Sequence, residues 1–157
     1  MPQLLPKSLL GLVSILALCA PPLLALVPNN EAVIVNSGST NTIGYRIYVT
    51  PAGEVSYVDG RGRGQGKLPA NLTRRLFNDI NAAMPLSKLP VRQSCVKPVS
   101  FGTSTTVQLG AERTSDLSCP GNSKAQKLDN DVNAIAKFLR VTTVPTSQGK
   151  PLPPQNF

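Results

Sequence analysis

The chain has 157 residues, of which 41% are hydrophobic and 4% aromatic, and 16 basic against 8 acidic side chains give a net charge of +8. It contains no histidine, which excludes a Ser-His-Asp triad, a Cys-His pair and any histidine-ligated metal site. It also has no tryptophan, and so few aromatic residues argue against a stacking platform for sugars or single-stranded nucleic acid.

The first 25 residues have the composition of a secretory signal peptide. Lys7 is their only charge, an apolar run extends from Leu9 to Leu18, and small residues follow at Ala20 and Ala25. An apolar run of about ten residues suits a signal peptide, whereas a membrane-spanning helix needs about 20. We therefore expect cleavage after Ala25 and a secreted or periplasmic protein.

Two alternatives for this segment stay open. An apolar run from Leu9 to Val27 is long enough for a retained anchor, but Pro21-Pro22 lies in its middle, and proline inside a helix costs about 3 kcal/mol. Cys19 is the candidate for lipid attachment, although Leu18 stands where bacterial lipoprotein signals place a small residue. We expect contact with a membrane only if Cys19 is lipidated.

Removal of residues 1–25 leaves 132 residues with 15 basic and 8 acidic side chains. We expect a single domain over residues 26–140. Residues 141–157 contain four prolines and no periodic apolar face, which predicts a mobile tail.

The first half of the domain has a strand pattern. Residues 32–35 are apolar enough for a short strand, and residues 43–50 alternate with the period of two that marks a half-buried strand. Pro51–Glu54 has turn composition and leads to a partner strand at residues 55–58. Residues 59–67 contain glycine and arginine without apolar side chains, which predicts a loop.

The rest of the domain has the pattern of a helix, a second hairpin and another helix. Apolar side chains from Leu72 to Ala83 recur at helical spacing, so we expect a helix over residues 70–84. Residues 101–109 alternate again and turn at 110–113 into a second hairpin, and another amphipathic helix follows from Ser123 to about Arg140. The expected order β-β-α-β-β-α is an α+β domain in which two hairpins form an antiparallel sheet and both helices cover one face.

Cys95 and Cys119 remain once Cys19 leaves with the signal peptide. In an oxidising compartment an isolated pair indicates one structural disulfide. The loop that it closes is about 25 residues long, for which the chain-entropy model gives about 3.5 kcal/mol of stabilisation.

The glycine- and arginine-rich segment resembles no established phosphate loop. The spacing fails both the P-loop pattern and G-x-G-x-x-G, because Gln65 or Lys67 falls where the last glycine should be and Leu68 follows Lys67. No acid intervenes between Asp59 and Asp79, however, so the segment is either a solvated connection or a ligand-binding basic surface. The basic residues concerned are Arg61, Arg63, Lys67, Arg74 and Arg75.

Other chemistry is weakly indicated. Ser94 has Lys97 three residues later, the S-x-x-K spacing of some serine hydrolases, and the acidic residues are scattered without the spacing of a calcium loop. We expect no metal and no cofactor.

Part of the chain resembles a group of small exported bacterial proteins of unknown function, over roughly residues 36–140. The likeness implies a bacterial source and one domain, and it assigns no catalytic residue. It is carried by residues 36–42, Gly44-Tyr45, Lys67-Leu68-Pro69, Leu76-Phe77, Pro85-Leu86, Leu89-Pro90, Cys95, Ser100-Phe101-Gly102-Thr103 and Asp116-Leu117-Ser118-Cys119-Pro120.

These observations favour an exported, non-enzymatic binding or inhibitory module. Its expected partner is an anionic polysaccharide, lipopolysaccharide or another secreted protein, and not a specific nucleic acid. A hydrolase that uses serine or carboxylate chemistry and a structural envelope protein are the alternatives.

Overall fold

The computed structural model describes residues 30–98 and 100–154. The expected signal peptide, its cleavage site and Cys19 lie outside the described residues. None of the helices in the described ranges is both long and apolar enough to cross a membrane. The helices are α1 (Ala70–Ala83), the short 3-10 helix η1 (Leu86–Lys88) and α2 (Ser123–Leu139), and the strands are β1 (Ala32–Asn36), β2 (Thr42–Ile43), β3 (Tyr45–Val49), β4 (Glu54–Asp59), β5 (Gly62–Lys67), β6 (Thr105–Leu109), β7 (Glu112–Arg113) and β8 (Val144–Pro145).

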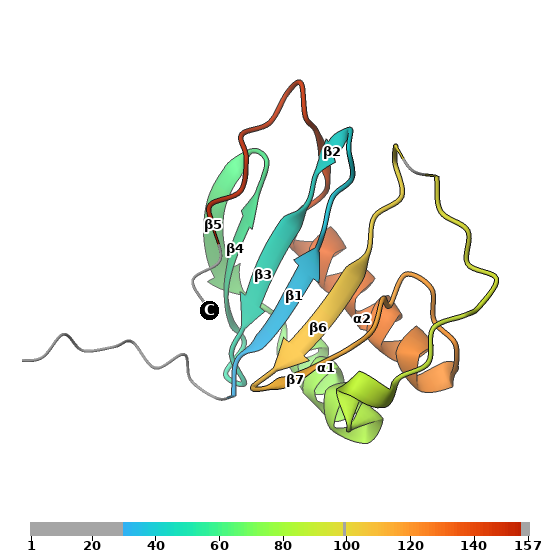
Figure 1. Ribbon diagram of the computed structural model, residues 1–157. Helices are drawn as coiled ribbons and strands as arrows, with labels where there is room; N and C mark the ends of the chain where they lie inside the picture. Colours follow the sequence, from blue (N-terminus) through green and yellow to red (C-terminus); the bar gives the residue numbers. More distant parts are fainter. Residues whose placement is uncertain (1–29, 99, 155–157) are drawn as a thin grey trace, which may run out of the picture.

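The fold is α+β, as expected, and is built on an antiparallel sheet. Six strands pair in the order β5-β4-β3-β1-β6-β7, and a separate two-stranded sheet joins β2 to β8. β1 connects the two halves of the large sheet, because it pairs with β3 on one side and with β6 on the other. Both long helices lie behind this sheet in Figure 1, so its other face is left free of helices.

The core lies between the helices and the covered face of the sheet. Ile34 of β1 and Ile47 of β3 are fully buried, as are Leu76 of α1 and Leu128 of α2. Burial of one such side chain contributes about 1.5–3 kcal/mol. The helical spacing in the sequence therefore predicted both helices and the faces that they bury.

The ends of α2 have local causes. The side chain of Asn122 accepts a hydrogen bond from the Ala125 N–H at 2.9 Å, so Asn122 caps the helix and Ser123 is its first residue. At the other end Arg140 adopts the left-handed conformation, with φ 57°, and its N–H bonds to carbonyls of the last turn.

The expectation of a loop over residues 59–67 was wrong. Only Gly60 and Arg61 form the turn, and residues 62–67 pair with β4 over six positions as the edge strand β5. Glycine disfavours strands and the segment has no apolar alternation, so its conformation depends on the neighbouring strand. The sheet thus contains more than the two expected hairpins.

The second hairpin is shorter than expected, and the disulfide is present. β6 begins at Thr105 rather than near Phe101, whose side chain is 65% exposed. Cys95 is bonded to Cys119, with their Cα atoms 5.8 Å apart.

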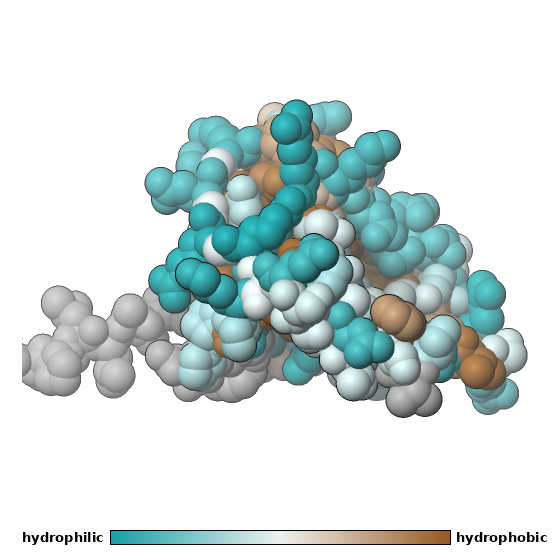
Figure 2. Space-filling view, turned by 90° about the horizontal axis from the view of Figure 1, so that it is seen from above, coloured by the Kyte–Doolittle hydropathy of each residue, from teal (hydrophilic) through white to brown (hydrophobic). Residues whose placement is uncertain are grey.

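The end of the molecule that carries β2 has a mainly hydrophilic surface with separate apolar patches (Figure 2).

The segment after α2 contacts the rest of the domain instead of leaving it. Val141 and Val144 are buried, and β8 pairs with β2. Further along, the Lys150 N–H donates to the Gly60 carbonyl at 2.9 Å. The expected tail over residues 141–157 therefore has contacts with β2 and with the turn at Gly60, while residues 155–157 lie outside the described part of the chain.

Candidate functional site

The helix-free face of the sheet collects polar side chains from three adjacent strands. In the register of the strands, Arg46 of β3 lies beside Val58 of β4, and Val58 lies beside Arg63 of β5. The next row on the same face joins Tyr48, Ser56 and Gln65. Because side chains alternate along a strand, both rows point away from the buried face that contains Ile47.

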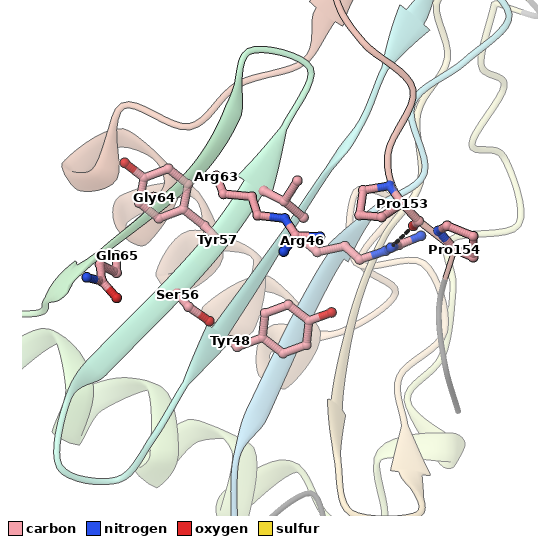
Figure 3. Close-up of a pocket in the computed structure, with 10 residues that line it drawn as sticks. Arg46, Tyr48, Ser56, Tyr57, Arg63, Gly64, Gln65, Pro153 and Pro154 are labelled. Atoms are coloured by element: carbon pink, nitrogen blue, oxygen red, sulfur yellow. Dashed lines mark hydrogen bonds between the residues drawn. The ribbon is translucent and has the colours of Figure 1, made fainter. Parts of the chain in front are cut away.

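These residues line a hollow of about 790 Å³, which we name the arginine groove (Figure 3). The side chains on the helix-free face supply two guanidinium groups, the hydroxyl groups of Tyr48 and Ser56 and one amide, while Tyr57 borders the hollow from the other face of β4; none of the ten described lining residues is acidic. The lining consists of Arg46, Tyr48, Ser56, Tyr57, Val58, Arg63, Gly64, Gln65, Pro153 and Pro154.

Arg46 occupies one side of the groove beside the C-terminal segment. Its Nη1 donates to the Pro153 carbonyl at 2.7 Å (Figure 3). Its Nε is buried and has no hydrogen-bond partner among the described residues. Arg46 is therefore tied to the C-terminal segment through one of its guanidinium nitrogens.

The close packing of Tyr57 against Gly64 explains why a glycine is needed in β5, the strand that forms one wall of the groove. A Cβ atom at this position would lie 2.2 Å from Cζ of Tyr57, so only glycine leaves room for the ring. The Tyr57 ring covers the backbone of β5 and packs against the core. Arg63 and Gln65, which flank Gly64, are thereby left to present their side chains on the helix-free face.

The five basic residues proposed from the sequence do not form one cluster. Arg63 alone lines the arginine groove. Lys67 pairs with Glu54 at 2.9 Å on the exposed surface, and Arg75 of α1 pairs with Asp131 of α2. Arg74 is exposed on α1, and Lys67 and Arg74 line a separate hollow of about 350 Å³.

Arg61 is engaged in the turn between β4 and β5. Its Nη2 lies 2.6 Å from Oδ2 of Asp59 and also donates to the Arg140 carbonyl. Burial by itself raises the pKa of the Asp59 carboxyl, but the hydrogen bonds from Arg61 outweigh it and the pKa lies below its usual value. Arg61 and Arg63 share a third hollow, of about 290 Å³, with Arg140.

Sequence reasoning missed Arg46, Tyr48, Ser56 and Gln65. The signal that could have found them is the alternation of glycine with a long polar residue in Gly62–Lys67, which has the period of a strand. A strand at that position puts Arg63 and Gln65 on one face. It still does not identify Arg46 as their neighbour, because this depends on the register of β3 against β4.

The structure also brings a serine and a lysine together. The Lys97 ammonium donates to Oγ of Ser118, to the Thr103 carbonyl and to Asp116. Burial raises the pKa of Asp116, yet the hydrogen bonds from Lys97 and Ser118 bring it below its usual value. Asp116 also accepts the Ser118 hydroxyl at 2.6 Å.

This arrangement disfavours serine chemistry. A lysine that activates a serine must be neutral and must accept the hydroxyl proton. Here Lys97 forms an ion pair with Asp116, and the Ser118 hydroxyl donates to Asp116 and to the Thr103 carbonyl, not to the lysine. Ser94, which has the S-x-x-K spacing, is exposed.

Two further observations concern metal ligands and similarity to known proteins. Within residues 30–98 and 100–154, no three acidic, cysteine or histidine side chains gather as a metal site would need. No family model matches the chain, and no curated protein sequence matches it.

Proposed function

We propose that this protein is an exported, non-enzymatic binding module that holds an anionic polysaccharide or lipopolysaccharide in the arginine groove. The observation that carries the proposal is the lining of the groove, with Arg46, Arg63, hydroxyl and amide groups and no acidic side chain. Sulfate, phosphate and uronate groups offer several oxygens to such donors. Arginine suits them because its planar fork donates two parallel hydrogen bonds.

Export is part of the same proposal. The Cys95–Cys119 disulfide supports it, because disulfides persist in oxidising compartments. The apolar N-terminal segment supports it through its composition.

The first prediction concerns the two groove arginines. Replacement of both residues in Arg46→Gln/Arg63→Gln should weaken retention on immobilised heparin, with elution at lower salt and an affinity at least about 10-fold lower, because a hydrogen bond to a charged group contributes about 1.5–3 kcal/mol. Affinity chromatography in a salt gradient, and titration with lipopolysaccharide, measure the effect.

Arg74→Gln/Arg92→Gln is the matched control. Both of its positions are exposed and outside the groove, and it removes the same two charges. We expect it to lower retention only slightly, as a change in net charge does. Equal loss in the two double variants would show nonspecific attraction and contradict the groove as the site.

A further inference from the structure

We propose that residues 150–154, here named the C-terminal strap, compete with the anionic ligand for Arg46 and thereby regulate the arginine groove. This inference rests on the proposed function, since it describes how that site is opened. It is based on the position of the strap. Pro153 and Pro154 line the groove, and the Pro153 carbonyl accepts a hydrogen bond from Arg46 at 2.7 Å.

The chemistry of the strap complements the groove. Its sequence is Lys150-Pro151-Leu152-Pro153-Pro154, so three of its five backbone nitrogens carry no hydrogen. A chain of this kind presents mainly carbonyl oxygens, and prolines hold it extended without internal hydrogen bonds. A carbonyl oxygen at Arg46 therefore occupies the position that a sulfate or carboxylate oxygen would take.

The segment immediately before the strap is anchored, which keeps the strap near the groove, because β8 pairs with β2 and Gly149 packs against Ile43 and Val144. The Lys150 N–H donates to the Gly60 carbonyl at 2.9 Å and is the first contact of the strap itself, so this bond breaks when the strap is released. A Cβ on Gly60 would lie 2.9 Å from Cβ of Val144, so glycine permits this close approach. An anchored strap has a high local concentration at the groove and can compete although it makes few contacts.

A strap that competes lowers the apparent affinity of the groove. Ligand binds only the fraction of molecules in which Arg46 is released, and the apparent dissociation constant rises by the inverse of that fraction. Weakening the strap should consequently tighten ligand binding, the opposite of what loss of a contact surface would do.

The test uses the full chain with Cys95 and Cys119 oxidised, and a heparin octasaccharide as the probe. The variant Pro151→Gly/Pro153→Gly makes the released strap more flexible, and each such change favours release by about 2- to 5-fold. The two changes together favour release by about 4-fold or more, and we expect this variant to bind the octasaccharide tighter than the natural chain by at least about 4-fold. The control Pro51→Gly/Pro98→Gly changes two exposed prolines outside the groove and should leave the affinity unchanged.

Hydrogen exchange of the Lys150 amide supplies a second measurement, which ligand binding would not accelerate if the strap had only a structural role. Octasaccharide binding should speed the exchange of the Lys150 amide, which the bond to Gly60 protects, whereas ligands usually slow exchange near their sites. Unchanged affinity in Pro151→Gly/Pro153→Gly, or unchanged exchange of the Lys150 amide on binding, would contradict competition between the strap and the ligand. Either result would leave the proposed function of the groove intact. If neither chain binds the probe, the proposed function fails and competition fails with it, while Lys150 exchange without probe still shows whether the strap is seated.

Discussion

A carboxyl group is buried in this protein at Asp131, where burial disfavours its charged form. Asp131 is 2% exposed between the two long helices, and its Oδ1 accepts a hydrogen bond from Nε of Arg75. Its Oδ2 is buried and has no hydrogen-bond partner in the described part of the chain. Burial raises the pKa of Asp131, the contact with Arg75 lowers it, Asp79 raises it again, and the net direction is upward.

The raised pKa predicts how Asp131 affects stability. Above the unfolded value of 3.8, the unfolded chain releases this proton while the folded chain keeps it, so the free energy of unfolding falls as pH rises toward the folded pKa. The slope is about 1.4 kcal/mol per pH unit at most. Asp131→Asn should remove this component and flatten the pH dependence from pH 4 upward, as urea unfolding at several pH values would measure. Parallel stability curves for the two chains would show that Asp131 titrates normally.

Asp59 and Asp116 affect the pH dependence of the free energy of unfolding in the opposite direction to Asp131. The pKa of Asp59 and that of Asp116 lie below their usual values, so their contribution is present above the unfolded value of 3.8 and is lost as pH falls through the folded pKa. Subtraction of the Asp131→Asn curve from that of the natural chain cancels these groups and isolates Asp131.

At the scale of elements, β5 is the strand whose existence depends most on its neighbours. Three of its six residues are glycines that point toward the helix side, while Arg63, Gln65 and Lys67 share the helix-free face. Its order comes from pairing with β4 and from the Tyr57 ring. Charged side chains on an edge strand also discourage pairing with other sheets.

Two valine substitutions in β5 should separate strand preference from packing. Gly64→Val places a side chain 2.2 Å from Tyr57 and should lower the free energy of unfolding by about 1–3 kcal/mol, as overpacking does. Gly66→Val meets only Val55, at 3.8 Å, and should be neutral or slightly stabilising because valine favours strands. Urea midpoints compare them, and equal effects would show that the Tyr57 contact does not determine the choice of glycine.

At the scale of the whole molecule, the disulfide and the groove lie at opposite edges of the sheet. Figure 1 shows the loop between η1 and β6 on one side and β5 on the other. Lys97 adds a second tie to this loop through Thr103, Asp116 and Ser118. Stability and binding should therefore respond separately to changes in the loop.

Cys95→Ser/Cys119→Ser tests this separation. Loss of the crosslink, which joins residues 24 positions apart, should lower the free energy of unfolding by about 3.5 kcal/mol because the unfolded chain gains freedom. Heparin affinity, measured well below the unfolding temperature, should stay within about twofold of the natural value, as expected for distant independent sites. A parallel loss of affinity would link the loop to the groove.

The sequence by itself determined both helices, the faces that they bury, the strands β1, β3 and β4, and the pairing of Cys95 with Cys119. The helices and strands follow from local periodicity, and the disulfide follows from the expectation that Cys19 leaves with the signal peptide, after which Cys95 and Cys119 are the two remaining candidates. The tertiary structure alone decided that Gly62–Lys67 is a strand, that Arg46 and Arg63 share a groove, and that Pro153 reaches Arg46 from 107 residues away. The physical reason is that periodicity records which side of one element is buried, whereas the neighbours of a side chain depend on strand register and on packing between distant segments.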